Sequence, residues 1–459
     1  LGRRPAPSVD RLFMPVPRRV LKIFAYLGCL SICYPFALHP SRQPTPQPLV
    51  ASALSSATGG PHRWMGQGGG AKQTKTVQAN AVDSEVKHST VPDREMLTAE
   101  VINRAKGSLF GLFIADALGM PAHWYYSVGD LQRHYGKITD FVAPKEPHPG
   151  SIMSLSSTGG GGRGGQRGSI IGDVINHGKK HLWGQRGIHY HHGMRAGENT
   201  LNALCARVVM RSIAAAGTFD PQHSLNAYVK FMTTPGSHND TYAETYHRMF
   251  FSNWHRGVKP EQCADNDGHN TDSVGGMVAL PPVATWAALT GQSAEEAGKA
   301  AAAQVALTHR SDTLQKYAIL YGRMIANLIR GADLRQEVQE AARAVGFGKI
   351  ASYIGLEDTQ VVGGMLSPAC YIDDSFKTVL YFAYKYHDRP EEGLIGNVNC
   401  GGENVHRGAT LGALLGAANG LNKWPERWVK GLAESGAIQS EVDKLIETAM
   451  PAGTLKSEL

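Results

Sequence analysis

Acidic side chains are missing from a long stretch near the start of this chain, because neither aspartate nor glutamate occurs between Asp10 and Asp83. The 459 residues carry a formal net charge of +7. Basic residues of the acid-free stretch supply most of this excess, so the charges of the remainder nearly balance. A balanced surface lacks the basic field that nucleic-acid binding requires. We therefore expect no nucleic-acid partner for the folded part.

Cysteines and long apolar runs are also scarce. The six cysteines form no C-x-x-C pair, and their spacing matches neither a cysteine zinc site nor a disulfide framework. The longest apolar run, from Ile23 to about Leu38, is too short and too interrupted to predict a membrane span. We expect no membrane contact for the mature domain.

The acid-poor stretch is typical of a targeting segment. Met14 is followed by basic residues and then by the apolar run, as in a signal peptide. Residues 39–82 are rich in Ser, Thr, Pro, Gln and Gly, as in a transit peptide. A two-part plastid address and a plain secretory signal with a disordered linker both remain open. Residues 1–94 are predicted to be targeting segment and disordered linker, and residues 95–455 to form one domain.

Strand-like alternation is scarce in that domain, whereas helical periodicity is present almost throughout. The pattern predicts a helix that begins near Thr98, further helices over residues 200–216, 312–330 and 375–387, and a last clear one over residues 408–420. The predicted fold class is all-α. The Gly- and Arg-rich residues 156–168 interrupt the pattern and are expected to form a loop.

Small residues recur at every fourth position on two of these helices. They are Gly107, Gly111, Ala115 and Gly119 on the first, and Gly408, Gly412, Gly416 and Gly420 on the last. A stripe of small residues lets another backbone approach closely. The sequence therefore predicts that its central helices pack tightly.

A Gly-Glu-Asn tripeptide occurs twice, at residues 197–199 and 402–404, each time before an apolar helix. Each copy places a carboxylate and an amide at a helix N-terminus, where free backbone N–H groups favour anions. If the fold brings the two N-termini together, both halves of the chain contribute to one polar site.

Four segments carry a resemblance to a known family. They read GLFIADALGMPAHWY from Gly111, GENTLNALCARVVMRS from Gly197, LTHRSDTLQKYAILYGRMIANLIRG around Thr308, and NVNCGGENVHRGATLGALLGAANG from Asn397. In order and spacing, over roughly residues 97–425, they resemble the motifs of the ADP-ribosylglycohydrolase family. The resemblance implies a single large domain of orthogonally packed helices. It also implies two magnesium ions in a central cleft, and hydrolysis of the bond that links ADP-ribose to a protein side chain or a small molecule.

The chain departs from the family's metal-binding pattern. Asp116 and Gly119 of the first motif are kept, but the glutamate that follows it is replaced by His123. Residues 197–200 stand where the family has Thr-Asp-Asp-Thr, and residues 403–406 where it has Asp-x-Asp-Thr. Two carboxylates replace four. Because magnesium requires near-octahedral oxygen ligation, we expect at most one divalent ion, with ligands from Glu198, Asn199, Thr200 and Glu403.

The leading hypothesis is a rebuilt glycosidase site in which Glu198 and Glu403 form the catalytic carboxylate pair. One would activate water, and the other, or His406, would protonate the leaving group. The residues expected to bind substrate are Asp116, His123, Asn199, Asn404, His406, His238, Asn239 and Asp240. The expected partner is a small-molecule or ADP-ribosylated protein substrate.

Other polar residues have simpler explanations. His191, Glu244 and His247 are individually best explained as structural or solvated, and Thr308-His309 as a capping and packing element. Trp124 to Tyr126 could stack on a base or a sugar, although core packing explains them equally well. The alternative hypothesis for the whole chain is a non-catalytic binding or structural protein, like the family's lens crystallins, that kept the fold and lost the metals.

Overall fold

The computed structural model describes residues 94–155 and 170–449. Within these residues every regular element is a helix, and the only β-pairings are isolated bridges such as that between Asp265 and His309. The predicted all-α class is confirmed. The expected targeting segment and the Gly-rich loop both lie outside the described residues. No helix in the described part of the chain is long and apolar enough to cross a bilayer.

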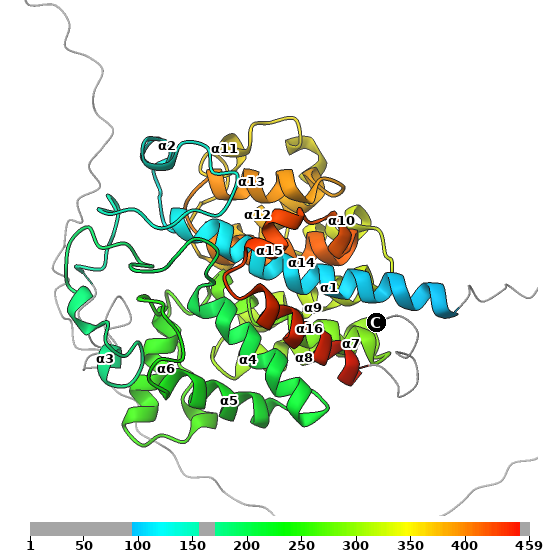
Figure 1. The fold of residues 1–459 in the computed structure, drawn as a ribbon. Helices are drawn as coiled ribbons and strands as arrows, with labels where there is room; N and C mark the ends of the chain where they lie inside the picture. Colours follow the sequence, from blue (N-terminus) through cyan, green and yellow to red (C-terminus); the bar gives the residue numbers. More distant parts are fainter. Residues whose placement is uncertain (1–93, 156–169, 450–459) are drawn as a thin grey trace, which may run out of the picture. The chain divides into compact units, whose positions relative to one another are not determined.

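The α-helices follow one another along the chain with short 3-10 turns between them (Figure 1). They are α1 (Arg94–Gly119), α2 (Val128–Tyr135), α3 (Ile170–Asp173), α4 (Leu201–Ala216), α5 (Pro221–Thr233), α6 (Thr245–His255), α7 (Pro281–Leu289), α8 (Ala294–Ala306), α9 (Asp312–Ile329), α10 (Leu334–Ala344), α11 (Asp358–Val361), α12 (Ile372–Lys385), α13 (Pro390–Asn399), α14 (Asn404–Asn419), α15 (Glu426–Gly431) and α16 (Ser435–Ala449). The 3-10 turns are η1 (Met120–Ala122), η2 (Lys180–Leu182), η3 (Pro260–Gln262), η4 (Val274–Met277), η5 (Ile350–Tyr353) and η6 (Leu421–Lys423).

The helices predicted from periodicity are α1, α4, α9, α12 and α14, and their observed bounds agree with the prediction to within a few residues. Caps explain where some of them begin. The Ser311 hydroxyl accepts a hydrogen bond from the Leu314 amide at 3.0 Å and so starts α9. A cap also ends a helix: at the C-terminal end of α4, Gly217 adopts a left-handed conformation with φ of 73°.

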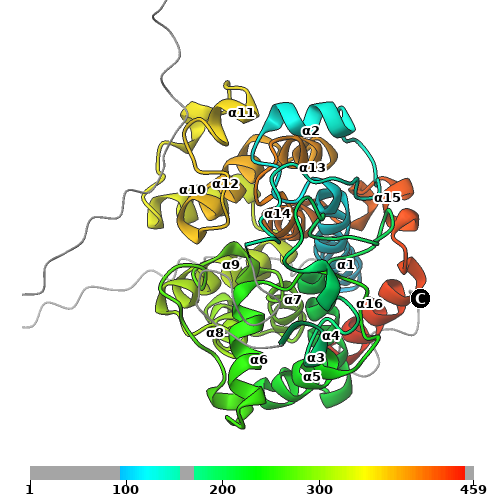
Figure 2. The ribbon, with the colours of Figure 1, turned by 90° about the vertical axis from the view of Figure 1, so that its left-hand side faces the viewer.

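Helices α1 and α14 are in backbone contact along their glycine stripes (Figures 1 and 2). A Cβ atom at Gly412 would lie 2.1 Å from the Gly111 carbonyl oxygen, and one at Gly416 would lie 1.9 Å from the Gly107 carbonyl oxygen. No side chain fits at such distances. The predicted tight packing is therefore confirmed, and it brings together two helices that are about 300 residues apart in sequence.

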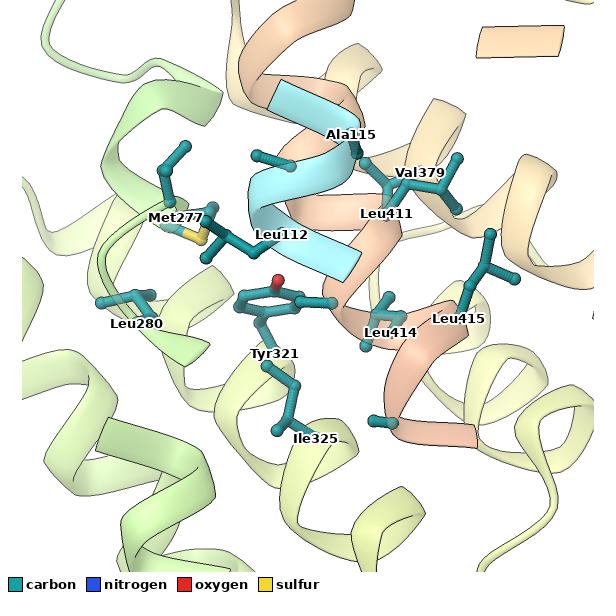
Figure 3. Packing of buried hydrophobic residues seen from close by; sticks show 14 of the residues in the cluster. Leu112, Ala115, Met277, Leu280, Tyr321, Ile325, Val379, Leu411, Leu414 and Leu415 are labelled. Atoms are coloured by element: carbon teal, nitrogen blue, oxygen red, sulfur yellow. The ribbon is translucent and has the colours of Figure 1, made fainter. Parts of the chain in front are cut away.

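A large apolar core surrounds this contact (Figure 3). Leu112 of α1 and Leu411 of α14 are fully buried in it, as is Tyr321 of α9. The Tyr321 hydroxyl donates to the Thr410 carbonyl at 2.9 Å, which fixes α9 against α14. A second apolar cluster lies under the segments that follow α1 and precede α6, and it includes Trp124, Tyr190 and Tyr242. These segments supply most of the polar site described below.

The first prediction tests the glycine contact. Gly412→Ala should lower the free energy of unfolding by about 3 kcal/mol or more, because its new methyl group meets backbone that cannot move without separating α1 from α14. Gly436→Ala in α16 is the matched control, since its Cβ would meet nothing within 4 Å; it should raise stability by about 0.5–1 kcal/mol. Urea unfolding followed by circular dichroism measures both. Equal effects at the two positions would contradict the account of the contact.

The second prediction concerns a buried histidine. Burial lowers the pKa of His309 to about 3, and its Nε2 atom has no hydrogen-bond partner among the described residues. The unfolded chain takes up a proton near pH 6.5 while the folded chain does not, so stability falls as the pH drops below 6.5. Relative to His309→Gln, the wild type should lose about 2 kcal/mol between pH 7 and pH 5. Urea unfolding at both pH values measures this. His181 is exposed, so the free energy of unfolding of His181→Gln should depend on pH as that of the wild type does. The same pH dependence in His309→Gln would show that the pKa of His309 is not lowered by folding.

Candidate functional site

The N-terminus of α14 carries a fully buried carboxylate. Glu403 is the N-cap of the helix, and its Oε1 atom accepts from the His406 amide at 3.4 Å. The two preceding glycines have φ of 63° and fit between distant backbone segments. A Cβ at Gly401 or Gly402 would lie 2.2 Å from the carbonyl oxygen of Tyr125 or Pro368, respectively. Gly402 of the second Gly-Glu-Asn segment and Gly401 before it are therefore required to bring Glu403 into the interior.

Two imidazoles and an indole surround the Glu403 carboxylate. The Nε2 atom of His123 lies 3.0 Å from Oε1, and the Nδ1 atom of His406 lies 2.9 Å from the same oxygen. The Trp124 indole N–H donates to the other oxygen, Oε2. Trp124 has φ of 59°, a left-handed conformation that is strained for a large residue. The strain is a further sign that this position is fixed by the site around it.

A line of hydrogen-bonded side chains continues from His123 into the interior. His123 Nδ1 lies 2.7 Å from His191 Nε2, and His191 Nδ1 lies 2.8 Å from an oxygen of Asp240. The other Asp240 oxygen accepts from the Leu201 amide at 2.8 Å, at the start of α4. The anion at the N-terminus of α4 is thus a carboxylate of the chain itself.

The same nitrogen of His406 lies near a second buried carboxylate. Glu244 Oε1 lies 3.7 Å from His406 Nδ1, and Glu244 Oε2 accepts from the Asn202 side-chain amide at 2.6 Å. Asn202 in turn contacts His247 at 3.1 Å, and His247 contacts the Tyr228 hydroxyl at 2.6 Å. Glu403 and Glu244 therefore both lie near the Nδ1 atom of one imidazole.

The environments of these groups move their pKa values apart. Burial raises the pKa of Glu403, but the charges of His123 and His406 outweigh it and hold that pKa well below its usual value. Burial dominates for Glu244, whose pKa is raised. Burial also lowers the pKa of His123, to about 4, whereas the two carboxylates overcome it at His406 and raise that pKa to about 9. Two carboxylates with opposite shifts are the arrangement that acid–base pairs show.

Three residues of the first two motifs form a separate group. Asp116 accepts from the Asn199 amide at 2.9 Å, from the Thr200 backbone N–H at 2.8 Å and from the Thr200 hydroxyl at 2.6 Å. The Asn199 amide also donates to the Phe113 carbonyl at 2.7 Å. Burial raises the pKa of Asp116 in spite of these bonds. This group ties α4 to the C-terminal end of α1.

Glu198 lies in different surroundings from Glu403. Its side chain is partly exposed and pairs with Arg195, whose Nε atom lies 2.8 Å from Glu198 Oε1. Asn239 donates to the same carboxylate at 3.3 Å. Glu198, His238 and Asn239 all line one cavity of about 130 Å³. Among the described residues, Glu198 and Glu403 share no hydrogen-bond partner. The expected run 238–240 is therefore divided, because only Asp240 joins the line that leads to Glu403.

Asn404, expected to bind substrate, is engaged with the backbone. Its amide donates to the Val398 carbonyl at 3.2 Å and to the Gly119 carbonyl at 3.3 Å, while its Oδ1 atom has no partner among the described residues. Val405 is fully buried and offers no ligand atom. The contacts of Asn404 connect α14 to α1 and use both N–H groups of its side-chain amide, while Val405 supplies no ligand atom at all.

The donor set does not fit a pair of magnesium ions. Asp116 already accepts three hydrogen bonds, Glu198 is paired with Arg195, and Val405 is apolar. Magnesium requires near-octahedral oxygen ligation and binds imidazole poorly. The described cluster that could hold an ion is instead His123, Glu403 and His406, whose ligand atoms lie within 4.8 Å of one another.

Sequence reasoning did not assign His191, Glu244 and Trp124 to this site. Nothing in the local sequence distinguishes them from ordinary loop and helix residues, and only the fold brings them to Glu403. The one signal in the sequence, and for His191 alone, is the density of histidine, since His189, His191 and His192 lie within four residues.

Comparison with known proteins agrees with the fold and the motifs. The family model for ADP-ribosylglycohydrolase matches residues 97–454, so the chain belongs to the ADP-ribosylglycohydrolase family. It is similar to the ADP-ribosyl-[dinitrogen reductase] glycohydrolase of Rhodospirillum rubrum, with 24% identity over 356 residues, which are 77% of this chain and 99% of that protein. A solved structure described as an ADP-ribosylglycohydrolase-related protein complex matches with 17% identity and a TM-score of 0.45, covering 77% of this chain and 100% of that one.

The third prediction tests the line from Asp240. Asp240→Asn should lower the free energy of unfolding at pH 7 by about 2–4 kcal/mol, because it removes the charge that accepts from His191 and from the start of α4. Asp220→Asn at the exposed N-cap of α5 is the matched control and should change stability by less than about 0.5 kcal/mol, since Asn caps as well as Asp. Urea unfolding compares them. An Asp240→Asn protein as stable as the control would show that the line contributes nothing to the fold.

Proposed function

We propose that this protein hydrolyses a glycosidic bond in an ADP-ribosyl or related nucleoside-type substrate. Membership of the ADP-ribosylglycohydrolase family supports a hydrolase of this kind. The observation that carries the finer proposal is the pair of buried carboxylates, Glu403 and Glu244, which both lie near the Nδ1 atom of His406. The repeated tripeptide predicted a different pair, Glu403 with Glu198. We propose Glu403 with Glu244 in its place.

The two carboxylates of this pair lie no farther apart than those of glycosidases. Both Oε1 atoms contact the same nitrogen, at 2.9 and 3.7 Å, so the two carboxylates cannot be farther apart than the two contacts together. Glycosidases hold their carboxylates within roughly 5–9.5 Å of each other. Glu198 has no comparable contact with Glu403.

The pKa directions assign roles within the pair. Glu403, whose pKa is held well below its usual value, is the carboxylate that stays ionised, stabilises positive charge at the anomeric carbon and accepts a proton from the attacking water. Glu244, whose pKa is raised, is the donor to the leaving group. The water oxygen bonds to the anomeric carbon as the glycosidic bond breaks, one proton passes to Glu403, and one passes from Glu244 to the departing atom.

An exposed aromatic residue lies near Glu403. Tyr126 exposes 54% of its surface, and burial of its hydroxyl together with the Glu403 charge raises its pKa. An exposed ring beside a buried carboxylate suits stacking on a base or a ribose. The name of the Rhodospirillum rubrum relative specifies an ADP-ribosylated protein, dinitrogen reductase, as its substrate. We propose the same substrate class, an ADP-ribosylated protein, for this chain.

The fourth prediction tests the carboxylate pair. Purified protein is assayed for release of ADP-ribose from ADP-ribosylated protein and small-molecule substrates. Glu403→Gln and Glu244→Gln should each lower kcat/KM by about 100-fold or more, because each removes one partner of the proton transfer. Glu198 is a glutamate too, but it is partly exposed and lies outside the pair. Glu198→Gln should therefore change kcat/KM by less than about threefold.

Two results would contradict this proposal. If Glu198→Gln abolishes activity while Glu244→Gln does not, the pair is Glu198 and Glu403 instead. If no substrate of this class is hydrolysed, the alternative of a non-catalytic protein gains support. The enclosure of Glu403, whose two oxygens already contact His123, His406 and Trp124, is the observation that favours that alternative.

A further inference from the structure

We propose that His123, Glu403 and His406 form a binding site for a single divalent ion of the zinc type, in place of the magnesium pair implied by the family. The ligands would be His123 Nε2, a Glu403 oxygen and His406 Nδ1, which lie within 4.8 Å of one another. This inference does not rest on the proposed reaction. It rests on the number of protons available to a line of hydrogen-bonded side chains, on the Nδ1 atom of His406, which has no hydrogen-bond partner among the described residues, and on the side chains that contact His123 from behind.

The hydrogen-bonded line from Asp240 to Glu403 is one proton short. It contains three contacts, namely Asp240 to His191, His191 to His123 and His123 to Glu403. Each contact needs one proton, while a neutral imidazole carries one and an ionised carboxylate carries none. Two histidines therefore supply two protons for three contacts. Either one imidazole is protonated, or a cation replaces the missing proton at one contact.

The contact that a metal ion completes is the one between His123 and Glu403. If His191 donates to Asp240, and His123 Nδ1 donates to His191, the Nε2 atom of His123 presents a lone pair toward the Glu403 carboxylate at 3.0 Å. Two lone pairs at that distance repel each other. An ion bound by both atoms removes the repulsion and satisfies every other proton in the line.

His406 provides an independent indication. It is 2% exposed, and its Nδ1 atom has no hydrogen-bond partner among the described residues, although it lies 2.9 Å from Glu403 Oε1. The contact is close but lacks the alignment of a hydrogen bond. Residues 403 and 406 are three apart at the start of α14, so they face the same side of the helix. A buried nitrogen without a hydrogen-bond partner therefore lies beside the same oxygen that His123 contacts.

The side chains behind the three ligands resemble the surroundings of metal-bound histidines. A histidine that ligates a metal usually gives its second ring N–H to a carboxylate or another acceptor, which fixes its tautomer and orientation. His123 has His191 and then Asp240 in this position. Glu403 is likewise held by the Trp124 indole on the oxygen away from His123.

The donor types select the ion. Two imidazole nitrogens and one carboxylate oxygen suit zinc and similar borderline ions, whereas magnesium prefers oxygen ligands throughout. The two contacts with Glu403 Oε1, at 3.0 and 2.9 Å, are close to the ~3.3 Å between neighbouring ligands of a tetrahedral ion with bonds of about 2.0–2.1 Å. Glu244 lies 3.7 Å from the same His406 nitrogen, so two carboxylates are available to balance a divalent charge.

The experiment measures metal binding directly. Tag-free full-length protein is stripped with a chelator and titrated with zinc, cobalt and magnesium by calorimetry, and the cobalt form is examined by absorption spectroscopy. We expect one zinc ion per chain, a cobalt spectrum typical of four-coordinate nitrogen and oxygen ligation, and no magnesium binding at the same concentrations. Enzyme activity is not a readout, so failure of the proposed hydrolysis and failure of this site are separate results.

Variants assign the ligands. His123→Gln and His406→Gln should each weaken zinc binding at least 100-fold, and His191→Gln, a positioning change, should weaken it by about 10–100-fold. His309→Gln, which removes a buried histidine outside the cluster, should bind zinc like the wild type. Circular dichroism and urea unfolding establish that each variant is folded before its titration is interpreted.

Three results would overturn the proposal. The first is absence of zinc binding by folded wild-type protein. The second is unchanged binding in both ligand variants. The third is a nitrogen-15 NMR spectrum of zinc-treated protein in which His191 or His123 is a doubly protonated imidazolium, since the missing charge would then be a proton. Retained binding in His191→Gln with an unaltered cobalt spectrum would remove that residue from the site.

Discussion

The backbone contact between α1 and α14 is the constraint on which the rest of the structure depends. Gly111 and Gly412 approach so closely that no side chain fits between the helices. This contact places the C-terminal end of α1, with Asp116 and then His123, beside the N-terminus of α14 with Glu403. The polar site is therefore a consequence of helix packing, and a residue that separated the two helices would disrupt the core and the site together.

Two imidazoles and an indole stabilise the fully buried carboxylate of Glu403. Burying an unpaired carboxylate costs several kcal/mol, so Glu403 requires compensating partners. Family members are expected to provide magnesium and aspartates for this purpose. In this chain His123, Trp124 and His406 surround the carboxylate, and Glu244 lies near the same nitrogen of His406. The substitutions at positions 123, 403 and 406 are mutually consistent, because both histidines contact the Glu403 carboxylate.

The fold could be predicted from sequence more fully than the site. Helical periodicity and the four-residue glycine spacing predicted α1, α4, α9, α12 and α14 and the close packing between helices, because these are local patterns. The importance of Glu403 followed from its place before an apolar helix. The contributions of His191, Glu244 and Trp124 could not be predicted, since they depend on loops whose paths are set by tertiary packing. For the same reason the repeated tripeptide suggested a symmetrical role for Glu198, which the structure places beside Arg195.

We propose that one cation completes the cluster at the junction of α1 and α14. A crystal structure of the zinc-treated protein, with diffraction data collected on both sides of the zinc absorption edge, tests this directly. We expect one anomalous peak per chain, within bonding distance of His123 Nε2, Glu403 and His406 Nδ1. An empty cluster in zinc-saturated crystals, or a peak at Asp116 and Glu198 instead, would contradict it.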